Sequence, residues 1–157
     1  HLVVSYPRRG TFATIVDITE LADVSEMRRS LEPLAARKAA LGASESDRGA
    51  LRALARDIER LGEKRVDKRG LMQYDLSVHR LIYRAAGNPH LEETLIRLDN
   101  LATRIWCLVL DKVPSVAGHI EEHVDLLEAI VAGEADKAEA MALAHITSFE
   151  QTIRAVL

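Results

Sequence analysis

Hydrophobic residues recur every three to four positions along most of the chain, which is the spacing of amphipathic helices. We expect six helices joined by short turns: residues 23–41, a second helix that Ser44 or Ser46 caps and that extends to Leu61, residues 67–86, 89–112 and 114–133, and a sixth after Gly133. The predicted fold class is all-α, an antiparallel bundle of about six helices.

Two short apolar stretches precede these helices and do not share their period. Residues 2–4 and 11–16 flank the segment from Ser5 to Gly10, which contains Pro7, Arg8 and Arg9. Short β-branched stretches on either side of a Pro- and Gly-containing segment predict a β-hairpin, here with a basic turn. We therefore divide the chain into a hairpin at residues 1–16 and a helical domain at residues 17–157.

The large apolar residues of the first helix define the face that we expect to point inward: Met27, Leu31, Leu34 and Leu41. Pro33 lies in the interior of that helix, where its missing N–H predicts a kink. In the fourth helix, residues 105–110 are apolar on nearly every side. This predicts central burial or a subunit contact there.

Composition narrows the class of protein. The chain has 157 residues, 48% of them hydrophobic and only 4% aromatic, which suits one helical core. A net charge of −3 does not give the positive field of a self-sufficient nucleic-acid-binding domain. The single cysteine, Cys107, excludes an internal disulfide framework and fits a reducing compartment. With no apolar run long enough for a bilayer and no signal-peptide pattern, we expect a cytoplasmic protein without membrane contact.

Asp75 and His79 stand out in the third helix because both lie among apolar residues. They are four residues apart, so on a helix they share one face at about 6 Å, close enough to bind one ion. A buried carboxylate is costly unless it is paired or bound to a metal. Asp75 therefore needs a partner, whether it is a structural residue or a metal ligand.

His123 and His145 occupy inward positions of the last two helices. His123 lies ten residues before Gly133 and His145 twelve after it, roughly 15 and 18 Å along the two axes. In an antiparallel pair they face each other at nearly the same level. Counted back from Gly87, His79 is eight residues away and Asp75 twelve, so all four residues could meet in one layer.

Three imidazoles and one carboxylate suit a divalent metal ion such as zinc, nickel, manganese or iron, and the residues alone do not choose among these metals. A single histidine on an apolar face is more often a hydrogen-bonded core residue, and the coincidence of four positions makes the metal and the structural interpretation about equally supported. The segment His119-Ile120-Glu121-Glu122-His123 matches the H-x-x-E-H pattern of inverted zinc peptidases. Only 34 residues follow this segment, too few for the catalytic domain of such a peptidase. We therefore expect His119 to lie near the rim of a pocket. We expect His90, in the first turn of its helix, to be exposed.

Two arginines are candidates for binding an acidic ligand. Arg28 lies four residues before Glu32 and beside the apolar stripe of the first helix, where an ordinary intrahelical ion pair is the simpler interpretation. Arg104 precedes the apolar pair Ile105-Trp106. For Arg104 the structural and the functional interpretation are about equally supported.

These motifs resemble the GntR family of bacterial transcription regulators, specifically the FadR-like subfamily with an FCD ligand-binding domain. The segment from Tyr6 to Phe12 is similar to the wing that ends the family's winged helix-turn-helix domain, and Glu26 to Glu32 to the first effector-domain helix. Asp75-Leu76-Ser77-Val78-His79 resembles the aspartate and first histidine of the family's metal site. Glu122-His123-Val124 and Ala144-His145-Ile146 match the second and third histidines.

The resemblance implies a regulator in which residues 1–16 are a wing remnant and residues 17–157 bind a metal ion and a small organic acid. Arg104 and then Arg28 would contact the acid through charge-assisted bonds. Arg8 and Arg9 would contact operator DNA, which the intact protein would bind through a missing N-terminal domain. Paired operator half-sites imply a homodimer.

Two other functions remain open at this point. The metal itself could be the signal, which would make the protein a metal sensor. A metal-dependent enzyme is less favoured, because no general base is evident beyond the ligands and the paired Glu-x-x-His pattern of di-iron bundles is missing. We therefore expect no enzymatic activity.

Overall fold

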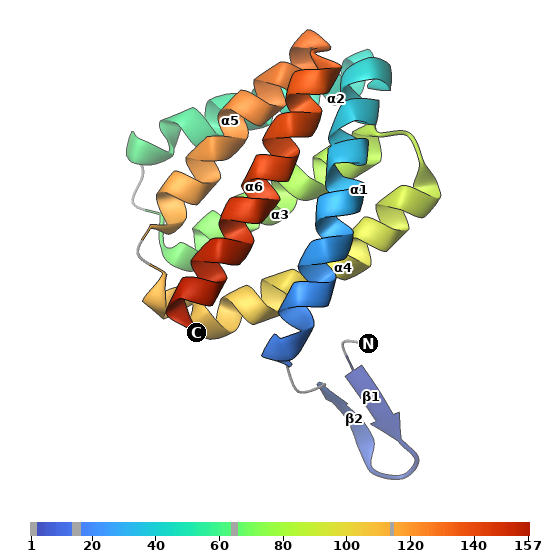
Figure 1. The fold of residues 1–157 in the computed structure, drawn as a ribbon, viewed down its shortest axis with the longest axis vertical. Coiled ribbons are helices and arrows are strands. Elements are labelled where there is room, and N and C mark those ends of the chain that lie inside the picture. Colours follow the sequence, from blue (N-terminus) through green and yellow to red (C-terminus); the bar gives the residue numbers. More distant parts are fainter. Residues whose placement is uncertain (1–2, 14–16, 64–65, 114) are drawn as a thin grey trace.

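The computed structural model of the chain describes residues 3–13, 17–63, 66–113 and 115–157, and it contains a β-hairpin followed by a helical bundle (Figure 1). The elements are β1 (Val3–Tyr6), β2 (Gly10–Ala13), η1 (Ile18–Glu20), α1 (Leu21–Gly42), α2 (Glu45–Glu59), η2 (Arg60–Glu63), α3 (Lys68–Ala85), α4 (Pro89–Val109), η3 (Leu110–Lys112), α5 (Val116–Ala132) and α6 (Ala135–Val156). The six α-helices confirm the predicted all-α fold class.

Side-chain caps explain where most of these helices begin. Ser44, Asp67, Asn88 and Ser115 each accept a hydrogen bond from the backbone N–H three residues later, at the start of α2, α3, α4 and α5. Such caps satisfy donors that have no partner within the helix. At the other end of α5, Gly133 adopts a left-handed conformation with φ of 78°, which turns the chain into α6.

The bundle places α1 at the centre of most helix contacts. In Figure 1, α1 and α6 lie side by side at the front with α5 next to α6, while α3 and α4 lie behind them. The helix α2 packs on α5 and α3. Because α1, α3, α5 and α6 all meet in the middle, residues from separate parts of the sequence share one interior.

The predicted inward face of α1 is wrong for three of its four residues. Met27, Leu34 and Leu41 are 47%, 42% and 67% exposed, and only Leu31 packs against the core. The buried face carries small residues instead, namely Ala35, Ala36, Ala39 and Ala40, together with Leu21 and Val24. Small side chains let α6 and α3 approach closely, so the large residues point away. The helix also continues through Pro33 without ending.

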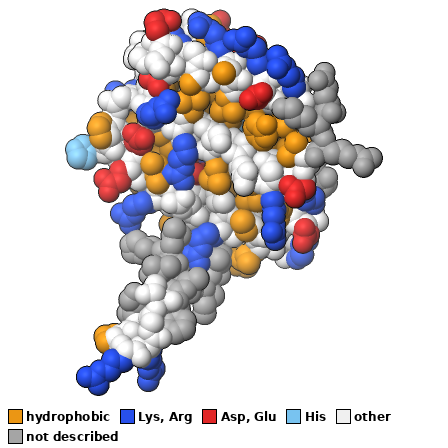
Figure 2. Space-filling view, turned by 180° about the vertical axis from the view of Figure 1, so that it is seen from behind, with side chains coloured by type: hydrophobic (Ala, Val, Ile, Leu, Met, Phe, Trp, Pro, Cys, Tyr) orange, Lys and Arg blue, Asp and Glu red, His pale blue; other side chains and the backbone are white. Residues whose placement is uncertain are grey.

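The β-hairpin extends from the end of the bundle where α1 begins (Figure 1). Val3 pairs with Ala13 and Tyr6 with Gly10 in antiparallel register, and the turn between them has positive φ at Arg8 (62°) and Gly10 (99°). Basic side chains stand at the tip of the hairpin (Figure 2), where Arg8 and Arg9 are exposed. Parts of the predicted strands, residue 2 and residues 14–16, lie outside the described residues.

The second half of α4 is buried on one side. Ile105, Trp106 and Val109 belong to the core, whereas Leu108 is 57% exposed and Cys107 is exposed. Among the described residues, no helix is both long and apolar enough to cross a membrane.

Candidate metal centre

Helix α3 presents Asp75 and His79 to the interior. They lie one turn apart on its buried face, 4% and 2% exposed, and the Nε2 atom of His79 is 3.7 Å from Oδ1 of Asp75. The apolar neighbours Leu71, Val78 and Ile82 share that face. The local sequence thus folds α3 as an amphipathic helix whose buried stripe contains two polar residues.

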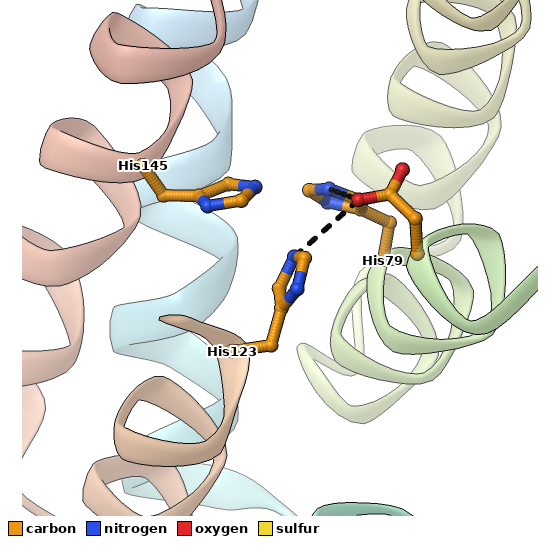
Figure 3. Close-up of side chains that lie close together, drawn as sticks. His79, His123 and His145 are labelled. Carbon is orange, nitrogen blue, oxygen red and sulfur yellow. Dashed lines mark ion pairs between the residues drawn. The ribbon is translucent and has the colours of Figure 1, made fainter. Parts of the chain in front are cut away.

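Helices α5 and α6 bring His123 and His145 to the same place. His123 is fully buried, its ring centroid lies 4.2 Å from that of His145, and its Nε2 is 3.6 Å from Oδ1 of Asp75. Figure 3 shows the rings of His79, His123 and His145 converging from three helices. The structure therefore brings together all four predicted residues, which we call the histidine–aspartate cluster.

The separations within the cluster suit a shared ion. Each of the four residues offers a ligand atom within 4.8 Å of all the others. Ligand atoms at the usual distance from a tetrahedral zinc ion lie about 3.4 Å from each other, close to the 3.6 and 3.7 Å seen here. The geometry fits a divalent ion with little side-chain movement.

Several buried polar atoms of the cluster have no hydrogen-bond partner among the described residues. These atoms are Oδ1 of Asp75, Nε2 of His123 and both ring nitrogens of His145. Leaving such atoms unsatisfied in a protein interior costs free energy. A bound ion would remove that cost, which is the structural argument for a metal at this position.

Each histidine of the cluster has a different oxygen atom near the nitrogen that faces away. Nδ1 of His79 lies 3.1 Å from Oε2 of Glu32, Nδ1 of His123 lies 3.2 Å from the carbonyl of Ile120, and Nδ1 of His145 lies 3.4 Å from Glu122. Such outer contacts fix the tautomer and orient the other nitrogen toward a metal. Nε2 of His79 and Nε2 of His123 thus both face Oδ1 of Asp75, and the position of Glu122 leaves Nε2 of His145 available to the same ion.

Glu32 belongs to a buried network of charges behind the cluster. Its carboxylate accepts a hydrogen bond from Nε of Arg28, whose guanidinium also lies 3.7 Å from Asp99. Arg80 in turn contacts Asp99 at 3.3 Å. The structure therefore supports the ion-pair interpretation of Arg28, which is 3% exposed.

The titration properties of the cluster suit metal binding. Burial lowers the pKa of His123 and of His145 well below 6.5, so both rings are neutral at pH 7, the form that binds a metal. Burial would also lower the pKa of His79, but the carboxylates of Glu32 and Asp75 outweigh it and raise that pKa to about 9. A metal ion must therefore displace a proton from His79.

A cavity of about 190 Å³ lies beside His119, whose ring contacts those of His123 and His145 in the cluster. Its lining includes Trp106 and Phe149, the hydroxyl-bearing residues Ser115, Ser148 and Thr152, and the pair His119 and Glu122. The placement of His119 at this cavity agrees with the predicted pocket rim, and His90 is exposed as expected.

The two arginines predicted to bind an acid do not line this cavity. Arg28 lies behind one wall, with its guanidinium carbon 5.4 Å from the ring centre of Phe149. Arg104 is half-buried on α4. Their contact with an effector therefore stays a prediction.

Fold and cluster together define a class of protein: an all-helical domain with three buried histidines and one buried aspartate at its centre. The FCD domain model matches residues 23–148, and the chain belongs to the FCD domain family. FCD domains occur in transcription regulators of the GntR family, so the family resemblance is confirmed and the chain belongs with regulators and not with enzymes. No curated protein sequence matches the chain.

Three solved structures share the fold. Escherichia coli McbR/YncC is 17% identical with a TM-score of 0.82 and aligns over 98% of this chain and 73% of its own. Streptococcus agalactiae GntR is 20% identical with a TM-score of 0.67, over 96% and 74%. The metal-free FCD domain of TM0439 is 20% identical with a TM-score of 0.67, over 90% and 96%.

Three residues around the cluster were not predicted from the sequence: Glu32, Asp99 and Glu122. Asp99 had a detectable signal, because it follows Leu91 and Leu95 at four-residue spacing on the buried stripe of α4. Glu32 could be paired with Arg28 along one helix, but its contact with His79 joins α1 to α3. Such contacts between helices depend on packing that the sequence pattern does not give.

Proposed function

We propose that the chain is the sensing part of a bacterial transcription regulator of the FadR-like subfamily, in which a metal ion and a small organic acid control DNA binding. The observation that carries this proposal is the convergence of four buried ligand residues with unsatisfied atoms at the centre of an FCD domain. Effector binding would shift the population of DNA-competent conformations.

Asp75, His79, His123 and His145 would hold the metal. Nitrogen-rich sites with one carboxylate bind zinc, nickel, manganese or iron, and zinc is our first choice. When bound, the ion supplies Lewis acidity that anchors a carboxylate, with no reaction required. The chain's own residues would orient the ligands, since Glu32 and the carbonyl of Ile120 contact the outer nitrogens of His79 and His123. Glu122 lies 3.4 Å from the outer nitrogen of His145.

The cavity beside the cluster is the proposed effector site. Its volume of about 190 Å³ admits a small molecule and is below the several hundred Å³ typical of pockets for drug-sized ligands. No lysine or arginine is among the described residues that line it. The metal is therefore the main positive group for an acid, and Arg28 behind Phe149 and Arg104 on α4 are candidates for secondary contacts.

The β-hairpin suggests how the domain connects to DNA. We interpret residues 1–16 as the wing of a winged helix-turn-helix domain, whose exposed Arg8 and Arg9 would contact operator phosphates or the minor groove. Such a regulator acts as a cytoplasmic homodimer on paired half-sites. The exposed stripe of Met27, Leu34 and Leu41 on α1 offers an apolar surface for self-association.

A direct test uses the full-length protein and the DNA upstream of its own gene. We expect the affinity for that DNA to change at least about tenfold when one member of a panel of small carboxylic acids is added. Unchanged affinity across the panel would contradict an acid effector. A change that follows chelation and resupply of metal alone would favour the metal-sensor alternative.

A further inference from the structure

A fourth imidazole, that of His119, reaches the histidine–aspartate cluster. His119 lies on α5 four residues before His123, so both rings project from the same face of one helix. His119 is the first residue of the H-x-x-E-H segment, and the proposed function gives it no role.

The ring of His119 is placed in the same way as those of the other histidines. Its Nε2 lies 3.6 Å from Oδ1 of Asp75, the atom that Nε2 of His123 approaches at the same distance. That Nε2 atom is buried and has no hydrogen-bond partner within the described part of the chain. Its Nδ1 faces Glu122 at 3.9 Å, as Nδ1 of His145 does at 3.4 Å.

Ring separations also agree with one shared ion. Imidazoles bound through Nε2 to one ion have centroids ~4.5 Å apart at adjacent positions and ~6 Å apart at opposite ones. The centroid of His119 is 4.3 Å from that of His145 and 5.7 Å from that of His123. His119 therefore fits a position adjacent to His145 on the same ion.

A separate second ion is the alternative, because His119, Glu122 and His145 also form a group with metal-ligand spacing. A neutral imidazole has one lone pair for a metal, and its other nitrogen carries the proton. If Nε2 of His145 binds the central ion, its Nδ1, which lies 3.4 Å from Glu122, carries the proton and cannot ligate another ion. With one ion, the carboxylate of Asp75 and each of the four imidazoles would bind through one atom, and no side chain would have to bind two ions.

We infer that His119 is a fifth protein ligand of the ion held by the histidine–aspartate cluster, at the coordination position that faces the cavity. This inference rests on the proposed metal site and deepens it. His119 is 12% exposed and lines the cavity next to Trp106 and Phe149, so it stands between the ion and the space for an effector. A carboxylate that reaches the ion from the cavity must take the position of His119.

The test compares purified full-length protein with the variants His119→Ala and His119→Gln, and uses Glu121→Gln and His90→Ala as exposed controls. Zinc affinity is measured by competition with a chelator, and zinc-edge X-ray absorption counts the bound imidazoles. We expect both His119 variants to bind zinc at least about tenfold more weakly, with three imidazoles in place of four. We also expect the zinc-loaded His119→Ala protein to bind acetate more tightly than the unsubstituted protein.

Different failures have different meanings. The unsubstituted protein could bind zinc with only three imidazoles, and the His119 variants could bind zinc as tightly as it does. That result would overturn the assignment of His119 as a fifth ligand and leave the four-residue site intact. Weaker acetate binding in His119→Ala would make His119 a direct contact for the acid and would also overturn the inference. Absence of zinc binding by the unsubstituted protein would overturn both the inference and the proposed metal site.

Discussion

Among single residues, Glu32 has an effect that its position in the sequence does not suggest. Glu32 connects the buried ion pair with Arg28 to the histidine–aspartate cluster. One of its carboxylate oxygens accepts a hydrogen bond from Arg28, and the other lies 3.1 Å from Nδ1 of His79. Burial would raise the pKa of Glu32, but Arg28 and His79 together hold it at about 2. Glu32 is therefore ionised at neutral pH and can orient His79 for a metal.

We predict that Glu32→Gln weakens zinc binding by about 10- to 100-fold, because losing the outer partner of a ligand histidine has effects of that size. The variant should also lower the free energy of unfolding by about 3 kcal/mol, since it leaves Arg28 buried without its main partner. Chelator competition and denaturant unfolding measure the two effects. Glu26→Gln, an exposed substitution on the same helix, is the control, and equal zinc affinity in Glu32→Gln would contradict this role.

His79 makes the stability of metal-depleted protein depend on pH in a defined direction. Its pKa is about 9 in the folded chain against 6.5 for the free side chain, so the stabilisation is complete below pH 6.5 and is lost as pH rises through 9. His123 and His145 have the opposite shift and lose stabilisation only below pH 6.5. The free energy of unfolding of metal-depleted protein should therefore fall between pH 6.5 and 9.

Thermal or denaturant unfolding across that pH range checks the prediction. Zinc-loaded protein should not show the decline, because the ion replaces the proton on His79 and binds more tightly as pH rises. A metal-depleted His79→Gln variant should also lose the alkaline decline. An identical decline in that variant would mean that another group causes it.

Among the elements, the α5–α6 turn determines whether two ligands meet. Gly133 has φ of 78° and directs its N–H to the carbonyls of Ala129 and Ile130, which ends α5 and reverses the chain. His123 and His145 lie ten and twelve residues from it. A change in this turn would therefore change the relative height of the two rings.

We predict that Gly133→Ala lowers the free energy of unfolding by about 1 kcal/mol, because the left-handed conformation is strained for alanine. Steric conflict adds little, since the nearest atom to an added Cβ is the Ala40 oxygen at 3.7 Å. Gly49→Ala in α2 is the matched control and should be neutral or stabilising by about 0.5 to 1 kcal/mol. Equal effects of the two substitutions in denaturant unfolding would argue against the strained turn.

For the whole molecule, self-association is the property that the exposed surface of α1 predicts. Met27, Leu34 and Leu41 follow each other at seven-residue spacing and form one outward stripe. We predict that Leu34→Lys weakens a homodimer at least about tenfold, measured by analytical ultracentrifugation. Leu157→Lys, at an exposed C-terminal leucine, is the control. Retention of the full dimer affinity in Leu34→Lys would place the interface elsewhere.

Much of the fold followed from the sequence because its signals are local. Caps such as Ser44 and Asp67, and the turn at Gly133, depend on a few neighbouring residues and were recognised with nearly correct boundaries. The inward face of α1 was wrong because alanine has no strong preference for burial. Whether Ala36 or Leu34 faces the core depends on how closely α6 and α3 approach.

The residues of the candidate site also divide into those with a local signal in the sequence and those without one. Asp75, His79, His123 and His145 were predicted because these polar residues interrupt apolar stripes at similar distances from turns. The contacts of Glu32 with His79, and of His119 with Asp75, join different helices and have no signature within either one. Three-dimensional packing is what adds the outer ring of partners to the four ligands.

The histidine–aspartate cluster is expected to hold one metal ion, and counting the bound ions tests this most directly. Native mass spectrometry combined with elemental analysis of the purified protein measures both the ion and any retained organic acid. We predict about one divalent ion per chain, zinc first, which Asp75→Ala and His145→Ala lose and His90→Ala retains. Full occupancy in both cluster variants would contradict the assignment.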